Sequence, residues 1–594
     1  LDKFFGKAGD DVTARLKSDY RETLSDLMTE QFNPAWIGWA RARGALTRNQ
    51  AHGSPANLLD FYAAADIPET EMFNKDRDIL VSKFATSAAH VTGRPLASSE
   101  TGTWLKEHFT ETLADVKQLV DELFVAGVNH VFYHGTCYSP DEAGWPGWLF
   151  YASTEMNPRN AIWRDAPILN TYIARCQSVL QTGRADNDLL LYWPIHDFWH
   201  SPEGMERSFS VHRRHWLHEQ RLGPVAQRLW QRGYTFDYVS DRQLASAAAR
   251  DGSIMMPGGA YRAIVVPACD HIPLSTMKQL LALAQGGATV IFDEHLPKDV
   301  PGLAQLEQRR GELNRLLAPL NSVSAIAAGD AREFQLGKGR VLVGDLGAGL
   351  AKASVAREPM ADQEGLLFVR RAWESGRHYF LFNHGKEPLE QWVPLATRAA
   401  AVALMDPMSG RIGLGAIRRP GDTRTEVYLR LEPGESLILR TVSDYQPEAP
   451  VWAYLTPAGS PVELHGTWNV NFIHGGPELP QPITTARLAS WTELGDDEAR
   501  RFAGTAVYSL EFDLPSELQT PTTQSQILLD LGKVCHSARV RLNGRELGAR
   551  FMPPYQVAAI NLKPKGNRLE VEVTNLSANR IRDLDRRGAK WKNF

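Results

Sequence analysis

The chain contains few cysteines and no long run of apolar residues. Only four cysteines occur among its 594 residues, and no two have the C-x-x-C spacing of a zinc cluster, so neither a disulfide framework nor a structural zinc site is expected. We expect buried, free thiols at Cys137, Cys176, Cys269 and Cys535. No apolar run reaches the roughly 18 residues of a membrane helix, so we expect no membrane span.

The chain also lacks an excess of charge of either sign. It has 65 Lys and Arg against 69 Asp and Glu, a formal net charge of -4. Nucleic acid and anionic lipid are bound by a concentrated basic patch, which this sequence does not contain, so we expect neither partner. Hydrophobic residues make up 43% and charged residues 23%, which is ordinary globular usage and excludes a disordered or fibrous chain.

A signal peptide is missing as well. The first residues lack its basic and apolar regions, yet the chain begins with Leu1 and not with an initiator methionine. We therefore expect the sequence to start downstream of its true beginning, and the missing signal assigns no compartment.

Trp and Tyr are plentiful, with 16 of each. Their flat amphipathic rings can stack on sugar faces, although most such rings fill protein cores.

The length predicts several domains, because single cores stop growing at about 250–300 residues. The pattern of apolar residues favours a multidomain α/β plus β protein. Its expected parts are the C-terminal half of a (β/α)8 TIM-type barrel over 1–160, an α/β accessory domain over 161–360, a small β-sandwich over 361–447 and an all-β part over 448–594 that resembles a galactose-binding-like jelly roll.

In the first part, a long helical pattern over 10–43 is followed by four short strand patterns that each open onto a polar segment. Strands are expected at 45–49, 64–67, 95–98 and 129–133, with helices over 76–90 and 105–126. This repetition is typical of a parallel sheet, whose functional residues follow the strands. A barrel needs eight such units and about 250 residues, so we interpret the four as strands five to eight.

The later parts carry weaker functional signals. Strands are expected at 188–192, 262–266 and 288–292 of an α/β unit that has no G-x-G-x-x-G motif and no Cys nucleophile elbow, so we interpret it as structural. Near the C-terminus, the run 538–545 contains Asn543-Gly544, a dipeptide typical of tight hairpins. The jelly roll around this hairpin is expected to be structural more often than sugar-binding.

Three glutamates are the best candidates for chemistry. Glu69, Glu71 and Glu100 are expected in polar loops just beyond adjacent strands. Cleavage of a glycosidic bond needs two carboxyl groups, one to protonate the departing oxygen and one to act as nucleophile or base. A lone loop glutamate is usually a solvated surface charge, but three at neighbouring strand ends favour a site. Glu142 and Glu155 lie farther along a loop rich in Trp and Pro, and we rank them lower.

Further polar and aromatic residues are expected on the same rim. Amide, imidazole and phenol groups can fix sugar hydroxyls, a Trp can stack on the ring, and Ca²⁺ takes carboxylate and carbonyl oxygens. The candidates for substrate binding are Asn49, Gln50, His52, Glu71, Trp104, His134 and Tyr138, and those for metal binding are Glu69 and Asn49. A buried His or Asn is more often satisfied by the backbone than by a ligand, so the prediction depends on their clustering.

Several runs resemble one family of enzymes. They are DYRETLSDL at 19–27, RNQAHGSPANL at 48–58, DIPE at 66–69, SSET at 98–101 and YHGTCYSP at 133–140. These runs are similar to the α-L-rhamnosidases of glycoside hydrolase family 106, and NQAHGSP at 49–55 is the most specific of them. The resemblance covers nearly the whole chain.

The resemblance implies a calcium-dependent, inverting hydrolase that removes terminal α-L-rhamnose from plant or microbial polysaccharides or glycosides. It implies a (β/α)8 barrel with accessory β domains, Glu100 as the general base, and Glu69 as a ligand of the metal or the sugar. The family's general acid comes from an earlier strand end that we do not find here. The chain is therefore expected to be truncated at both ends, and a periplasmic or secreted location is implied.

Two alternatives stay open. A retaining β-galactosidase-like hydrolase also joins a barrel, an α/β domain and β-sandwiches, and Glu100 is then its nucleophile. Alternatively, the chain is a carbohydrate-binding remnant without activity, because half a barrel does not close and one catalytic carboxylate is missing. The anomeric configuration of the product separates the two enzymes, and the reading frame upstream of Leu1 tests the remnant.

Overall fold

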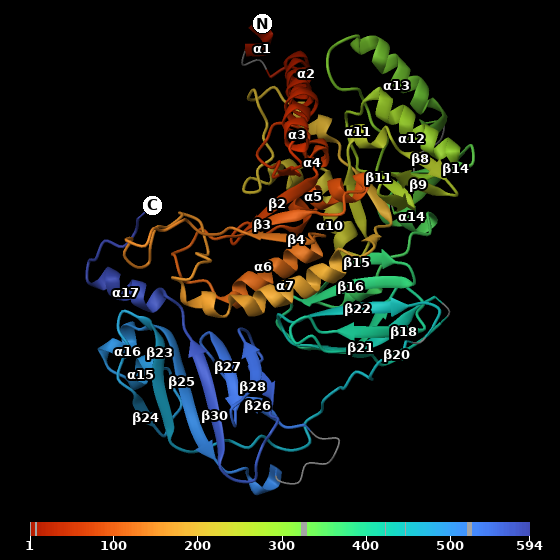
Figure 1. Cartoon of the computed structure of the whole chain (residues 1–594). Helices are drawn as coiled ribbons and strands as arrows, with labels where there is room; N and C mark the ends of the chain where they lie inside the picture. Colours follow the sequence, from red (N-terminus) through yellow and green to blue (C-terminus); the bar gives the residue numbers. More distant parts are fainter. Residues whose placement is uncertain are drawn as a thin grey trace.

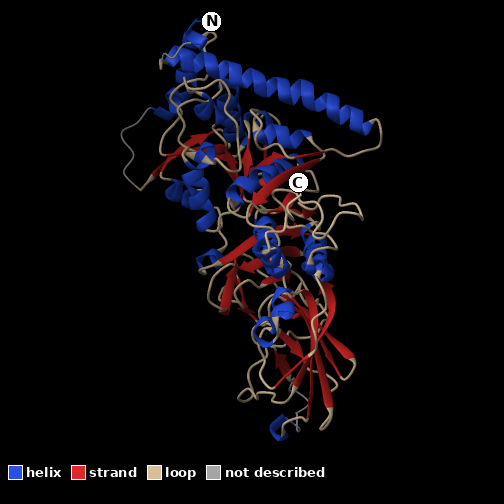
Figure 2. Ribbon diagram, turned by 90° about the vertical axis from the view of Figure 1, so that its left-hand side faces the viewer, coloured by secondary structure: helices blue, strands red, loops and turns tan. Residues whose placement is uncertain are grey.

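A computed structural model describes residues 2–5, 9–321, 329–421, 423–445, 447–518 and 526–593. Helices cover parallel strands in the first half of the chain, and strands dominate the last third (Figures 1 and 2). The mixed α/β and β multidomain architecture expected from the sequence is confirmed. None of the described helices is long and apolar enough to cross a membrane.

The first long element is a helix with a π-helical turn. It comprises α2 (Asp11–Leu27), η1 (Met28–Phe32) and α3 (Asn33–Arg41), and follows the short helix α1 (Asp2–Phe5). The helix begins at Asp10, whose carboxylate accepts a hydrogen bond from the Thr13 amide. The helix predicted over 10–43 is therefore confirmed.

The buried side of this helix is polar, contrary to the apolar stripe that the sequence suggests. Arg15 and Arg21 are buried, whereas Leu27 and Phe32 are exposed. Both guanidiniums donate hydrogen bonds to main-chain carbonyl groups of two loops, at 199–205 and 299–302. A guanidinium supplies five donors to such loop carbonyls, which an apolar stripe cannot do.

Four parallel strands follow in chain order. They are β1 (Arg48–Asn49), β2 (Ile67–Phe73), β3 (Ser98–Thr103) and β4 (His130–Tyr133), paired in the order β1-β2-β3-β4. The helices between them are α4 (Leu58–Ala64), α5 (Ile79–Thr92) and α6 (Leu113–Val125), and α7 (Ala166–Leu180) packs against α6. Figure 1 shows α6 and α7 side by side beneath this sheet. The predicted alternation of strands and helices is confirmed.

The bounds of two strands differ from the prediction in a way that moves the candidate glutamates. β2 and β3 run through 67–73 and 98–103, so Glu69, Glu71 and Glu100 lie within strands and not in the loops after them. The neighbouring Pro, Ser and Gly residues favour loops by local preference, but pairing with strands on both sides overrides that preference. The helix expected from 105 begins only at Leu113, where Thr112 forms a capping box.

A second sheet has the order β13-β14-β12-β11-β6-β7. Its parallel strands are β6 (Leu189–Tyr192), β7 (Phe236–Val239), β11 (Ala263–Val266), β12 (Thr289–Asp293) and β14 (Gly339–Gly344), and β13 (Ala331–Leu336) pairs antiparallel at the edge. The helices of this part are α8 (Ile195–Trp199), α9 (His215–His218), α10 (Leu222–Gln231), α11 (Asp241–Leu244), α12 (Leu274–Gly286), α13 (Leu306–Asn321) and α14 (Leu346–Lys352). The three strands predicted here are confirmed. Smaller elements are η2 (Ala161–Arg164), η3 (Pro359–Asp362) and the sheet β8 (Ala248–Arg250), β9 (Ser253–Met256) and β10 (Gly259–Tyr261).

The third part packs two antiparallel sheets, in the orders β19-β18-β22-β16-β15-β5 and β17-β21-β20. The strands are β15 (Leu366–Trp373), β16 (Gly376–Asn383), β17 (Leu389–Leu395), β18 (Ala401–Met405), β19 (Ile412–Leu414), β20 (Ile417–Arg418), β21 (Thr425–Leu431) and β22 (Ser436–Val442). Leu381 and Leu429 are among the fully buried residues between the sheets. β5 (Arg184–Ala185) pairs with β15. One strand from the part predicted to end at residue 360 therefore belongs to the sheet of the next part.

The last part is an antiparallel sheet in the order β24-β23-β25-β30-β27-β28 with a second pair, β26-β29. The elements are β23 (Trp468–Gly476), β24 (Ile483–Thr485), α15 (Trp491–Leu494), α16 (Asp497–Arg501), β25 (Ala503–Phe512), η4 (Ser516–Leu518), β26 (Leu528–Asp530), β27 (Ser537–Leu542), β28 (Arg545–Arg550), β29 (Gln556–Ala558), β30 (Asn567–Thr574) and α17 (Ala578–Arg586). Asn543 and Gly544 join β27 to β28, and both have positive φ, as a type I′ turn requires. The predicted hairpin is confirmed.

All four cysteines are free thiols. Cys176 and Cys269 are buried as expected, and Cys137 is half-buried. The prediction of burial is wrong for Cys535, which is exposed in the loop between β26 and β27.

Candidate active site

One face of the parallel sheet gathers the three candidate glutamates. Side chains alternate between the two faces of a strand, so Glu69 and Glu71 point to the same side of β2. In the strand pairing, Glu71 lies opposite Glu100 and Glu69 lies opposite Ser98. Neighbouring strands are about 4.8 Å apart, so the three carboxylates share one small patch. We call this side the carboxylate face; it carries Arg48, Gln50, Glu69, Glu71, Ser98, Glu100, His130 and Phe132.

The opposite side of the sheet is covered by helices. Met72 follows Glu71 on β2 and is buried in a core with Leu119 and Phe124 of α6. Because Met72 points toward these helices, alternation turns Glu69 and Glu71 away from them. The carboxylate face is therefore the side of the sheet opposite these helices.

Glu69 is held by two neighbours. The Ser98 hydroxyl donates a hydrogen bond to its carboxylate at 2.8 Å, and Arg48 Nε lies 3.0 Å from the same oxygen. The Arg48 guanidinium also lies over the Phe132 ring, 3.6 Å from its centroid. Burial raises the pKa of Glu69, and the Ser98 hydrogen bond and the Arg48 charge oppose that rise. Burial lowers the pKa of His130, and the same guanidinium lowers it further.

Glu71 is held in the same manner by residues from two other segments. The Thr103 hydroxyl donates to its Oε1 at 2.7 Å, and His52 Nε2 lies 3.1 Å from its Oε2. The side chains of Glu69 and Glu71 are each only 6% exposed. These contacts fix both carboxylates in place.

Glu100 differs from the other two in its access to solvent. Its side chain is 31% exposed. Gln50 Nε2 donates a hydrogen bond to its Oε2 at 2.8 Å, and His134 Nε2 lies 3.7 Å from its Oε1. One carboxylate oxygen is thus oriented by an amide, while the group as a whole remains open to a small molecule such as water.

The structure brings most of the predicted site residues together, and three lie elsewhere. Gln50, His52, Glu69, Glu71, Glu100 and His134 meet at the carboxylate face. Asn49 is one position from Arg48 and Gln50, so its side chain points to the other side of the sheet. Its amide nitrogen lies 3.4 Å from the Phe61 carbonyl oxygen. Trp104 is 3% exposed in the core with Met72, where it cannot stack on a sugar. Tyr138 is 80% exposed in the loop after β4.

The contacts of Glu69 do not fit the predicted calcium site. Ca²⁺ takes six to eight oxygen ligands, whereas the Glu69 carboxylate already faces a guanidinium and Asn49 points to the other side of the sheet. Among the residues that the structure describes, no group of three or more His, Cys, Asp or Glu side chains could hold a metal ion.

Sequence reasoning missed four residues of this face: Arg48, Ser98, His130 and Phe132. Each lies an even number of positions from a predicted residue of the same strand, so both side chains point to the same face. Counting alternate residues back from Gln50, Glu100 and His134 would have found them, but only with the strand bounds known.

Two known proteins are similar to this chain over most of its length. A protein of Formosa agariphila named putative beta-glucuronidase is 24% identical over 445 residues, which are 73% of this chain and 34% of that protein. The structure of a rhamnosidase from Novosphingobium sp. PP1Y matches with a TM-score of 0.81 and 24% identity, over 98% of this chain and 54% of that chain. This chain therefore shares the fold of that structure and spans about half of its length.

A family model matches the sequence directly. The model of glycoside hydrolase family 106, described as alpha-L-rhamnosidase, matches residues 8–413. The matched segment contains β1–β4, every residue of the carboxylate face and the whole second sheet. The chain therefore belongs to glycoside hydrolase family 106, the α-L-rhamnosidase family.

Proposed function

We propose that this chain provides the general base of an inverting α-L-rhamnosidase, which removes terminal α-L-rhamnosyl residues from plant or microbial polysaccharides or glycosides. The supporting observation is the difference among the three carboxylates. Glu69 and Glu71 are buried and paired with Arg48 and His52, whereas Glu100 is accessible and oriented by Gln50. Family membership favours this activity over the β-galactosidase-like alternative.

The geometry suggests how Glu100 acts. In an inverting hydrolase, a carboxylate removes a proton from a water molecule while that water's oxygen forms a bond to the anomeric carbon on the face opposite the leaving group. The anomeric bond to the leaving oxygen breaks, and a separate acid protonates that oxygen. The hydrogen bond from Gln50 holds the Glu100 carboxylate so that its other oxygen can face the water. Glu69 and Glu71 supply fixed acceptors for sugar hydroxyls beside it.

We propose that the sheet β1–β4 belongs to a (β/α)8-type barrel with the carboxylate face inside, since the sheet is parallel and its helices cover the other side. The last part, with its β27–β28 hairpin, is proposed as a galactose-binding-like jelly roll. A polysaccharide substrate favours a periplasmic or secreted location.

The Glu100→Gln variant of the full-length protein tests the assignment. Glutamine keeps the size and can still pair with Gln50, but it cannot accept the proton. Hydrolysis of 4-nitrophenyl α-L-rhamnoside is expected to fall by about 10²- to 10⁴-fold, with an unchanged melting temperature. The control is Glu142→Gln, at an exposed glutamate in the loop after β4, which should keep wild-type turnover. Equal turnover in both variants would refute the role of Glu100, and a wild type without activity would favour the carbohydrate-binding remnant.

A further inference from the structure

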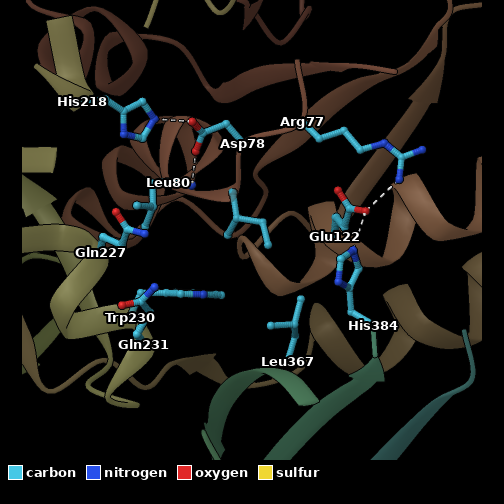
Figure 3. Close-up of a pocket in the computed structure, with 11 residues that line it drawn as sticks. Arg77, Asp78, Leu80, Glu122, His218, Gln227, Trp230, Gln231, Leu367 and His384 are labelled. Atoms are coloured by element: carbon cyan, nitrogen blue, oxygen red, sulfur yellow. Dashed lines mark hydrogen bonds and ion pairs between the residues drawn. The ribbon is translucent and has the colours of Figure 1, made fainter. Parts of the chain in front are cut away.

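A separate cavity of about 580 Å³ lies where three parts of the chain meet. Its walls come from the start of α5, from Glu122 on α6, from α9 and α10, and from β15 and the residue after β16. Figure 3 shows these side chains around an open centre. Cavities of 300–1,000 Å³ at domain junctions commonly bind small ligands. The helices α5 and α6 cover the opposite side of the sheet from Glu100, so this cavity is distinct from the carboxylate face.

The apolar wall of the cavity is built around Trp230. Its ring is partly exposed, and Figure 3 shows it edge-on, directed toward the centre, with Leu80 and Leu367 facing the same space. A flat indole ring offers a large apolar surface at little cost in side-chain entropy. The C–H face of a pyranose ring is matched to such a surface in size and polarity.

The polar wall is formed by charged side chains whose charges are already balanced. The side chain of Glu122 is 6% exposed, with Arg77 Nη1 at 2.8 Å and His384 Nε2 at 3.5 Å from its Oε1. Asp78 is paired with His218 at 2.5 Å and with Arg214 at 3.2 Å. Each of the two carboxylates thus faces a guanidinium. A charged ligand finds no uncompensated partner there, whereas a hydroxylated neutral ligand finds donors and acceptors.

Two glutamines complete the rim. Gln227 and Gln231 lie one turn apart on α10, so both side chains project from the same face of the helix. Both are exposed and line the cavity. Each amide offers two donors and one acceptor, which is the combination that vicinal sugar hydroxyls require.

We propose that this cavity is a second, non-catalytic binding site for a neutral pyranose unit of a glycan, with Trp230 as the stacking platform and Gln227, Gln231 and the Arg77–Glu122 pair as hydrogen-bonding partners. Such a site holds a sugar remote from the bond that is cleaved. Its occupant is set by the cavity's own chemistry and does not depend on the role of Glu100.

The test uses the full-length protein labelled with 5-fluorotryptophan. The ¹⁹F resonance of Trp230 is assigned by its loss in Trp230→Phe and followed during titration with methyl α-L-rhamnopyranoside, methyl β-D-glucopyranoside, methyl β-D-galactopyranoside and the anionic methyl β-D-glucuronide. At least one neutral glycoside is expected to shift this resonance saturably in the millimolar range. The glucuronide should bind at least about tenfold more weakly, because it must desolvate a charge beside a neutral wall. The resonance of Trp163, which is 42% exposed elsewhere on the surface, should not move.

Two further proteins, a double glutamine variant and Glu100→Gln, test whether the sugar binds in this cavity and not at the carboxylate face. Gln227→Ala/Gln231→Ala changes only exposed positions and is expected to weaken binding by about fivefold or more, because two hydrogen bonds are lost. Binding should be unchanged in Glu100→Gln. No saturable shift of Trp230 up to about 50 mM, tighter binding of the glucuronide, or an unchanged affinity in the double variant would each overturn the proposal. None of these results bears on turnover by Glu100, which is measured separately.

Discussion

Replacing Arg48 with Met tests whether a guanidinium, and not a metal, neutralises the buried carboxylate of Glu69. Loss of one partner of a buried ion pair costs about 3–5 kcal/mol, and loss of an exposed pair about 0.2–1 kcal/mol. The Glu69 side chain is 6% and the Arg48 side chain 38% exposed, so we expect an intermediate loss of about 2 kcal/mol at pH 8. For a domain of 150–250 residues this lowers the melting temperature by roughly 4–8 °C.

The loss should depend on pH. Burial holds the folded-state pKa of Glu69 above its ordinary value, so the folded protein binds this proton more tightly than the unfolded chain. The resulting stability is present below the unfolded-state pKa and is lost as the pH rises through the folded-state pKa. Removing Arg48 raises the pKa of Glu69 further. The difference in stability between Arg48→Met and wild type is therefore expected to shrink as the pH falls from 8 toward 5.

A double-mutant cycle isolates the ion pair. In the Glu69→Gln background, Arg48→Met should cost only about 0.5–1 kcal/mol, because just the contact of Arg48 with Phe132 is lost. The control pair Arg500–Asp497 is exposed, and Arg500→Met should cost less than about 1 kcal/mol at either pH. Melting curves of the four proteins at pH 5 and 8 give the result. A cost of Arg48→Met that is equal with and without Glu69 and at both pH values would refute the reasoning.

Three further outcomes are expected. Gln50→Ala removes the 2.8 Å hydrogen bond to Glu100 and should lower kcat on 4-nitrophenyl α-L-rhamnoside by about tenfold with little change in KM; an unchanged kcat contradicts a positioning role. Trp104→Ala should destabilise the protein by about 3–5 kcal/mol while KM below the melting temperature stays the same, and a large rise in KM would instead place Trp104 at the sugar. Excess EDTA should leave the melting temperature of the wild type unchanged, since Arg48 already faces Glu69; a fall that Ca²⁺ reverses and Glu69→Gln abolishes would identify a calcium ligand.

The sequence was sufficient to predict the succession of strands and helices around the site, because its polar segments recur at the ends of apolar runs. It was not sufficient to place Glu69, Glu71 and Glu100 within strands. Their neighbours Pro68 and Ser99 favour loops locally, and pairing with adjacent strands makes these segments extended. The shared face of the three glutamates then follows from strand register, which sequence alone does not give.

Residue type alone predicted Trp104 and Asn49 as ligand contacts, and the structure places both side chains away from the three glutamates. Trp104 follows β3 directly, where a stacking residue is expected, but its large apolar surface is buried in the same core as Met72. Asn49 differs from Gln50 by one position, and that single step turns its side chain to the other side of β1. Arg48 was not predicted because an arginine in a strand is usually a surface charge; here its partner, Glu69, lies 21 residues away on the next strand.

The configuration of the first sugar released tests the central claim most directly. Wild-type protein is mixed with an α-L-rhamnoside, and ¹H NMR spectra are recorded before the product mutarotates. If Glu100 activates water on the face opposite the leaving group, the first product is β-L-rhamnose. If α-L-rhamnose appears first, the reaction proceeds with retention, Glu100 cannot be the base of a single displacement, and the account is contradicted.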